Sequence, residues 1–426
     1  MGTGGALELD DLILVSIDDH VVEPRDMFER HVPAPYADRA PKVVTDDDGV
    51  EQWMFQGVSA GSTGLNAVVS WPKEDWGLDP SSFAEMRPGA YDVDERVRDM
   101  DRNGILASMC FPSFAGFAAS FFHRAPDKDL SSVMLRAYND WHIDEWCGSH
   151  PGRFIPLALL PVWDREGMAE EVRRVRAKGC NAVTMPELPH IMGLPSYHDL
   201  DYWGPFFSAV CDEGVVVNLH IGQGFDAIRS APDAPIDNLI ILATQVSAFA
   251  AQDLLWGGAF MAYPDLKVAW SEGGIGWIAF YLDRCDRHYR RQRWLGHDFG
   301  GKLPSEVFRD HSLACFVSDP STLKIRHDIG IDIIAWECDY PHSDSIWPDA
   351  PEEIFAELTA AGCTDEEMHK ITWQNACRFF DHDPFTVIPR REATVAARRA
   401  RAGDVDTATR SRHEWRELYQ AAHAAR

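Results

Sequence analysis

Short apolar runs alternate with longer segments of helical periodicity along the whole chain. Each helical segment ends just before a glycine or a polar turn, as Asn103 does before Gly104 and Glu213 before Gly214. The expected strands are 12–17, 105–111, 154–161, 180–186, 215–219, 266–271, 314–318 and 331–336. The expected helices are 92–103, 129–147, 165–178, 205–213, 245–263, 277–293, 351–361 and 365–380. This alternation predicts an α/β fold, a parallel sheet closed into a (β/α)₈ barrel.

An open, doubly wound sheet is the main alternative, but no glycine-rich phosphate turn follows the first run. Between the first strand and the first helix lies an insertion over about 25–91. In it, 42–45 and 51–56 flank Asp46-Asp47-Asp48-Gly49, which predicts a hairpin. Long loops after barrel strands lie over the active site, so Trp71 and Trp76 either close a lid or fasten the hairpin to the barrel.

Four of the apolar runs end in side chains that bind divalent metals. Asp18 and His20 follow the first run, and because residues i and i+2 of a strand share a face, both side chains are expected to point into the barrel while Asp19 points away. The other three runs end in His220, Glu272 and Asp339. Singly, such residues are more often hydrogen-bonded core groups, and Asp339 also fits a helix cap. Together, Asp18, His20, His220 and Asp339 predict a catalytic metal site that keeps an open position.

Composition narrows the possible partners. The 426 residues carry a formal net charge of −27, which disfavours nucleic acid and membrane surfaces as partners and leaves a small-molecule substrate. No apolar stretch reaches the roughly 18 residues of a membrane span, and residues 1–8 lack the features of a secretion signal. The nine cysteines form no CxxC pair, so a reduced, cytoplasmic protein is expected.

The C-terminal segment 387–426 has the opposite charge balance, with nine Arg against five Asp or Glu. We interpret it as a basic helical extension of a single barrel domain, 1–386. It packs either on its own acidic barrel or on a second subunit of a homodimer or higher homo-oligomer. A partner-binding arm is the other interpretation.

Four segments together resemble a known family. They are SIDDHVVEP (16–24), VVNLHIGQG (216–224), LKVAWSEGGIGW (266–277) and WECDYPHSDSIWP (336–348). In order and spacing, these segments are similar to amidohydrolase-related proteins of the 2-amino-3-carboxymuconate-6-semialdehyde decarboxylase type. The resemblance implies a distorted (β/α)₈ barrel with one divalent metal held by Asp18, His20, His220 and Asp339. Zinc is the expected ion, with manganese, cobalt and iron as alternatives.

Two positions depart from the family pattern. Glu272 stands where characterised decarboxylases of this type carry a histidine, and it is expected to act as general acid or base, or to orient His220 or a metal-bound water. No lysine occurs in 180–187, where binuclear amidohydrolases carry a bridging one, which favours a single metal; Glu187 is the residue that would change this inference.

Further residues are expected around the substrate. His342 is assigned a pocket role, and Asp339 a share in proton transfer. Arg25, Arg229 and Trp71 are candidates for substrate binding. Two reactions use these parts. The first is non-oxidative decarboxylation of a small aromatic or unsaturated carboxylate. The second is hydrolysis of an ester, lactone or amide by a metal-activated water, or a hydration with the same groups.

Overall fold

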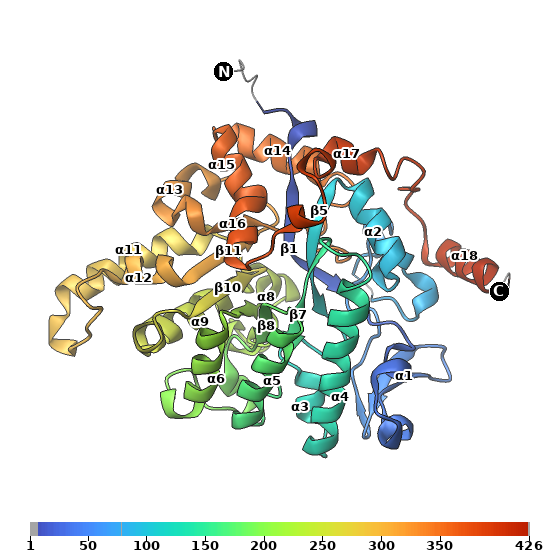
Figure 1. The fold of residues 1–426 in the computed structure, drawn as a ribbon, viewed down its shortest axis with the longest axis horizontal. Helices are drawn as coiled ribbons and strands as arrows, with labels where there is room; N and C mark the ends of the chain where they lie inside the picture. Colours follow the sequence, from blue (N-terminus) through green and yellow to red (C-terminus); the bar gives the residue numbers. More distant parts are fainter. Residues whose placement is uncertain (1–6, 78, 425–426) are drawn as a thin grey trace. The chain divides into compact units, whose positions relative to one another are not determined.

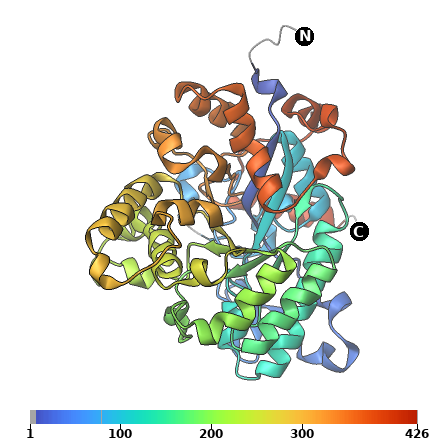
Figure 2. The same ribbon diagram turned by 60° about the vertical axis from the view of Figure 1, so that its left-hand side comes forward.

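The computed structural model describes residues 7–77 and 79–424 (Figures 1 and 2). By internal contacts, the chain divides into two compact units. The first comprises Met1–Leu157, Cys338–Glu353 and Asp383–Arg426, and the second comprises Ala158–Glu337 and Ile354–His382. The sequence order of strand followed by helix continues through both.

The first unit is built on a three-stranded sheet of order β1-β5-β6, in which both neighbouring pairs are parallel. Its strands are β1 (Leu14–Val21), β5 (Ile105–Pro112) and β6 (Phe154–Ile155). Every residue of β1 and β5 is buried, as expected for parallel strands covered on both faces. Its helices are α1 (Met27–His31), α2 (Val93–Arg102), α3 (Ser120–Arg124), α4 (Lys128–Asp140), a π-helical turn (Trp141–Cys147), α17 (Val395–Arg399) and α18 (Arg412–Ala424).

The second unit carries a six-stranded sheet of order β12-β11-β10-β9-β8-β7. The strands are β7 (Leu157–Leu159), β8 (Ala182–Met185), β9 (Val216–His220), β10 (Lys267–Ser271), β11 (Ser312–Phe316) and β12 (Ile334–Trp336). The pairs from β8 to β12 are parallel. The register places Ser271 beside His220, so the carboxyl ends of β9 and β10 coincide.

Helices follow most strands of the second unit, as a parallel sheet requires. They are α5 (Arg165–Ala177), α6 (Leu200–Glu213), α7 (Phe225–Ile228), α8 (Ile236–Leu242), α9 (Gln245–Trp256), α10 (Ala259–Ala262), α11 (Gly276–Arg291), α12 (Pro304–His311), α13 (Arg326–Ile329), α14 (Ala350–Ala360), α15 (Asp365–His369), a π-helical turn (Lys370–Gln374) and α16 (Asn375–Phe379). No single helix among the described residues has the length and apolarity to cross a membrane, although the bent pair α8 and α9 passes that test jointly.

All eight expected strands are present, and the differences have local causes. The run 154–161 forms two short strands, β6 and β7, on either side of Pro156, which has no amide hydrogen to donate. The expected helix 245–263 is divided at Gly258, whose φ of 89° lies in the left-handed region. Helix α6 begins at Leu200, five residues before the expected start, because the Asp199 side chain caps it by accepting from the Tyr202 amide.

The insertion contains the expected hairpin and holds the C-terminal helix of its own chain. Strands β2 (Lys42–Thr45) and β3 (Glu51–Phe55) pair antiparallel, followed by β4 (Val58–Ser59). From α18, Trp415 packs on Val68 and Trp71. Arg412 and Arg416 both pair with the buried carboxylate of Glu85. The basic extension therefore packs on the insertion within the first unit.

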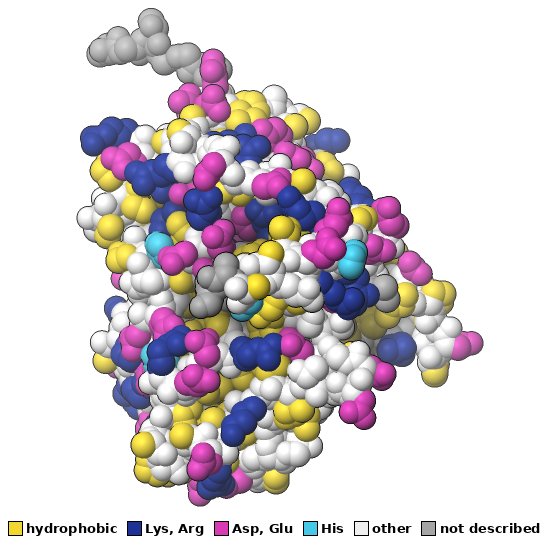
Figure 3. Space-filling model, turned by 90° about the vertical axis from the view of Figure 1, so that its right-hand side faces the viewer, with side chains coloured by type: hydrophobic (Ala, Val, Ile, Leu, Met, Phe, Trp, Pro, Cys, Tyr) yellow, Lys and Arg dark blue, Asp and Glu magenta, His cyan; other side chains and the backbone are white. Residues whose placement is uncertain are grey.

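Charged side chains of both signs occur on the surface. On the face shown in Figure 3, acidic and basic side chains are interspersed with apolar and uncharged ones. All nine cysteines are free thiols, and six of them are buried.

Candidate functional site

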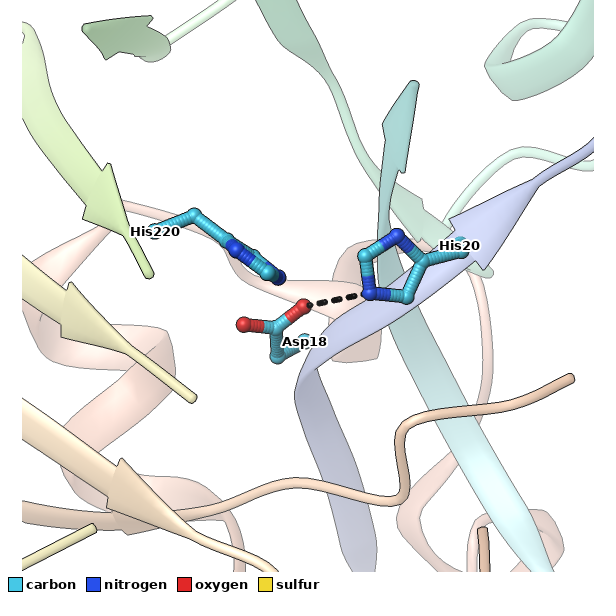
Figure 4. A group of neighbouring side chains, drawn as sticks. All are labelled: Asp18, His20 and His220. Atoms are coloured by element: carbon cyan, nitrogen blue, oxygen red, sulfur yellow. Dashed lines mark ion pairs between the residues drawn. The ribbon is translucent and has the colours of Figure 1, made fainter. Parts of the chain in front are cut away.

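The end of β1 presents on one side two side chains of the kinds that could hold a metal ion. Asp18 Oδ1 and His20 Nε2 lie 3.6 Å apart, and both side chains are fully buried (Figure 4). Asp19 points the other way, accepting hydrogen bonds from Ser16 Oγ at 3.0 Å and from Ser108 on β5. The strand alternation expected at these three residues is confirmed.

The loop that follows β12 brings Asp339 beside this strand end. The Asp339 amide donates to the Asp18 carbonyl at 2.9 Å, and the His20 amide donates to the Tyr340 carbonyl at 2.6 Å. Asp339 has a φ of 55°, in the left-handed region that residues other than glycine rarely adopt. No helix begins there, since α14 starts at Ala350, so the helix-cap alternative for Asp339 is excluded.

His342 completes a compact group in the first unit. Asp339 Oδ1 lies 3.2 Å from His20 Nε2 and 3.0 Å from His342 Nδ1. The two imidazole rings stack with centroids 3.8 Å apart. Ligand atoms of His20, Asp339 and His342 all fall within 4.8 Å of one another. Ligands about 2.1 Å from one ion are roughly 3.0–3.5 Å apart, so the 3.2 Å between His20 Nε2 and Asp339 Oδ1 fits two ligands of a single divalent metal.

The buried carboxyl groups of Asp18 and Asp339 also favour a bound cation. Burial, Asp339 and Asp19 all raise the pKa of Asp18 well above its usual value. Burial opposes ionisation of Asp339, but His342 and His20 outweigh it and lower the pKa of that carboxyl. Within the described residues, Asp339 Oδ2 and His342 Nε2 are buried without a hydrogen-bond partner. A bound divalent cation would offset the repulsion between the carboxylates and satisfy buried donor atoms.

In the second unit, His220 and Glu272 form a pair at the ends of β9 and β10. His220 Nε2 lies 3.2 Å from Glu272 Oε2, while its Nδ1 faces the Ile221 carbonyl. That arrangement fixes the ring and directs Nε2 toward the carboxylate. The Glu272 side chain is 24% exposed, whereas His220 is buried. Figure 4 labels His220 at its strand end.

Glu272 is held in place by Glu337, a role that the sequence does not predict. Its φ is 53°, again in the left-handed region. Its amide donates to Glu337 Oε2 at 3.3 Å, and the same oxygen accepts from the Cys315 thiol. The only sequence signal for Glu337 is its position at the end of β12.

Two further buried acids fasten loops near strand ends, and sequence reasoning gave neither this role. Glu23 accepts from the amides of Ser113 and Phe114, both at 3.1 Å. Glu187 accepts from the Gly224 amide at 3.4 Å. Burial raises the pKa of each carboxyl to about 7. A glutamate two residues past a strand end is the available signal, but it does not reveal which loop will donate to the carboxylate.

The residues expected at the substrate have other contacts. Arg25 pairs with Glu51 of β3 and lies over the Phe83 ring. Trp71 is buried at 2% exposure and donates from its indole to the Glu85 carbonyl at 2.9 Å. Arg229 is exposed after α7. The contacts of Arg25 and Trp71 lie within the insertion itself. The substrate roles of Arg25, Trp71 and Arg229 stay predictions.

The chain resembles known proteins in sequence. The amidohydrolase family model matches residues 31–382, more than half of the chain. The 2-amino-3-carboxymuconate-6-semialdehyde decarboxylase of Dictyostelium discoideum is 22% identical over 72% of this chain and 81% of its own length.

Solved structures share the fold of this chain. An amidohydrolase from Mycobacterium avium subsp. paratuberculosis K-10 superposes with a TM-score of 0.68 at 20% identity, covering 86% of this chain and 99% of its own. A dihydroxybenzoic acid decarboxylase from Polaromonas sp. JS666, solved with manganese and the inhibitor 2-nitroresorcinol, gives a TM-score of 0.57 at 20% identity, covering 88% and 98%. The likeness confirms the α/β barrel fold class. The chain therefore belongs to the amidohydrolase family of metal-binding enzymes.

Proposed function

We propose that this protein is a divalent-metal-dependent, non-oxidative decarboxylase of a small aromatic or unsaturated carboxylate. The observation that carries the proposal is the buried group of His20, Asp339 and His342 beside Asp18, in a chain of this family. The relatives described above that act on carboxylates by loss of CO₂ support the reaction class.

The proposed metal ligands are Asp18, His20, His220 and Asp339. The contacts of Asp339 with His20 and Asp18 in the first unit support three of these, and the buried imidazole of His220 at the end of β9 supports the fourth. Zinc suits the mixed nitrogen and oxygen donors, and manganese is the ion bound in the Polaromonas enzyme. When bound, the ion would supply Lewis acidity and a template for the substrate carboxylate and its neighbouring oxygen.

Glu272 is the proposed proton-transfer residue. Its carboxyl is partly exposed at the carboxyl end of β10 and is aimed by its contact with His220. In decarboxylation, its proton would go to the carbon that bears the carboxylate; the carbon–carbon bond then breaks, CO₂ leaves, and the bonding electrons return to the substrate. His342 would hold the Asp339 carboxylate in place through the 3.0 Å contact.

A panel of hydroxybenzoates, run in D₂O with zinc- or manganese-loaded protein, tests the reaction. Decarboxylation would release CO₂ and place deuterium on the carbon that lost it, with no ¹⁸O from labelled water in the organic product. Glu272→Gln, which keeps the size of the side chain, should abolish the reaction but retain the metal. Glu166→Gln is the matched control, because the Glu166 side chain lies on helix α5 and is 74% exposed. Full activity of Glu272→Gln would refute the proposed role.

Hydrolysis of an ester, lactone or amide is the second candidate. It is favoured by one observation: a carboxylate at position 272, facing His220 at 3.2 Å, is suited to take a proton from water. The same panel extended with acyl substrates separates the two reactions. Incorporation of ¹⁸O into a product carboxylate without CO₂ release would establish hydrolysis and rule out the lyase.

The cellular setting and assembly are also proposed. Nine free cysteines suit a reducing compartment, and we propose a cytoplasmic homo-oligomer. Sedimentation of the purified protein measures the oligomeric state.

A further inference from the structure

A basic cavity lies in the first unit at the opposite end of its sheet from the metal-binding residues. The cavity has a volume of about 360 Å³. The charged side chains that line it are Asp101, His150, Arg153, Glu392, Arg398 and Arg401. Since His20 pairs with Phe111 on β5, and Arg153 bonds to Ile105 and Leu106 at the start of that strand, the cavity is roughly 20 Å from the metal group.

Two of the arginines are buried and share one carboxylate. The side chains of Arg153 and Arg398 are 7% and 2% exposed. Asp101 Oδ1 lies 2.8 Å from Arg153 Nη2 and 3.4 Å from Arg398 Nη1. Arg401 pairs with Glu392 at 2.8 Å. Three guanidinium groups therefore face two carboxylates, which leaves a positive excess in a chain whose net charge is −27.

Contacts with the backbone use only part of the donors of these arginines. Arg153 donates from Nε to the Leu106 carbonyl and from Nη2 to the Ile105 carbonyl. Arg398 donates from Nε to the Glu392 carbonyl. In the part of the chain that the structure describes, neither Arg153 Nη1 nor Arg398 Nη2 donates to the protein. A purely structural role explains the first set of contacts and leaves these two donors unused.

The repulsion among the arginines supports an anionic ligand. Burial lowers the pKa of Arg153 to about 10, and repulsion from Arg398 and Arg401 adds to this effect. Clustering buried cations around too few carboxylates costs free energy, which a bound anion would offset. Guanidinium groups bind phosphate and carboxylate oxygens through paired hydrogen bonds. His150 adds an imidazole at the rim, 2.7 Å from Asp94.

We propose that this cavity binds a small polyanion, a phosphate compound or a di- or tricarboxylate, at a site separate from the metal centre. Its guanidinium groups come from the start of β6 and from the extension that follows Asp383, so a bound anion would tie these segments together. The volume admits a ligand larger than a free phosphate ion. The proposal does not depend on which reaction the metal site performs.

Calorimetric titration of the metal-loaded full chain tests the site, with inorganic phosphate and succinate as probes at constant ionic strength. We expect saturable one-to-one binding of at least one probe, and the preferred probe identifies phosphate or carboxylate as the ligand chemistry. Arg401→Gln should weaken binding about tenfold, the effect of one charge-assisted hydrogen bond. Because the Arg401 side chain is 53% exposed, this substitution should leave the fold intact.

Two controls separate this site from other effects. Arg165→Gln removes the same charge from α5, where the side chain is 47% exposed, and should leave binding unchanged. His20→Ala impairs the metal site and should also leave anion binding at the cavity unchanged. Absence of saturable binding by both probes would overturn the proposal, as would binding that is lost in His20→Ala or kept at full strength in Arg401→Gln.

Discussion

Two residues of the proposed site, Asp339 and Glu272, adopt backbone conformations that residues other than glycine rarely tolerate. Their φ angles are 55° and 53°. Such conformations cost about 1–3 kcal/mol and persist where the surroundings impose them. Here the Asp18 carbonyl accepts a hydrogen bond from the Asp339 amide, and the Glu337 carboxylate accepts one from the Glu272 amide. The directions of these two carboxylates are therefore set by backbone hydrogen bonds at strand ends.

Replacing Asp339 by Asn should separate charge from backbone conformation. Asn tolerates the left-handed region, so the loop should keep its shape, while the ligand charge is lost. We expect metal affinity to fall at least about 100-fold, with secondary structure unchanged, as measured by competition with a chelating dye. Asp201→Asn, an exposed aspartate in α6, is the control. An unaltered affinity in Asp339→Asn would exclude Asp339 as a ligand.

Glu23 should make stability depend on pH. Burial raises its pKa from 4.5 to about 7, so the folded protein holds this proton more tightly than the unfolded chain. The contribution of this proton to the free energy of unfolding is fully present below pH 4.5 and is lost as the pH rises to about 7. It amounts to about 3 kcal/mol in total.

Urea denaturation at several pH values, comparing wild type with Glu23→Gln, measures this contribution. The difference between the two should change through the interval from pH 4.5 to 7 and stay constant above it. The same pH dependence in both proteins would show that Glu23 titrates normally.

At the scale of elements, buried carboxylates join loops to strand ends throughout the two sheets. Glu23 holds the loop after β5, Glu187 holds the loop after β9, and Glu337 holds the residue after β10. Asp319, a partly buried residue after β11, also accepts from the Ile275 amide at 2.9 Å. Part of the acidity of the chain thus serves to order the loops that carry the site.

The C-terminal helix α18 is a stabilising element of the insertion. Trp415 is 6% exposed against Val68 and Trp71, so Trp415→Ala should cost about 3 kcal/mol and expose the amides of α18 and of residues 66–71 to hydrogen exchange. Leu418→Ala, on the same helix but 46% exposed, should have little effect. Equal exchange in both variants would mean that Trp415 does not hold the insertion.

At the scale of the whole molecule, binding of the metal should raise the melting temperature. Removing the metal leaves the buried carboxylates of Asp18 and Asp339 repelling each other, so the chelated protein should melt at a lower temperature. Adding zinc or manganese should restore the melting temperature in proportion to affinity. Calorimetry with and without chelator measures the shift. His327→Ala, a 66% exposed histidine, should respond as wild type does, whereas His20→Ala should lose the response. A wild-type melting temperature that ignores chelation would contradict a metal centre.

The net charge of −27 should also make the melting temperature depend on salt concentration. Repulsion among like charges opposes the compact state and is screened by salt. The melting temperature should therefore rise as NaCl increases from about 10 to 300 mM. A flat or falling profile would show that local ion pairs dominate over the net charge.

The sequence by itself determined the order of strands and helices and the residues at the strand ends. Burial of parallel strands produces apolar runs, and strand alternation places Asp18 and His20 on one side, so these features are visible without coordinates. The helical extension and the hairpin were also predictable, because helix periodicity and turn residues are local signals.

Only the tertiary structure decided how distant residues combine. The stacking of His342 on His20, the hold of Glu337 on Glu272, and the gathering of Arg153, Arg398 and Arg401 around Asp101 join residues far apart in the chain. Such pairings depend on loop conformation and burial, which no local pattern of residues encodes. The residues proposed to carry the chemistry were therefore readable from the sequence, while the groups that position them emerged from folding.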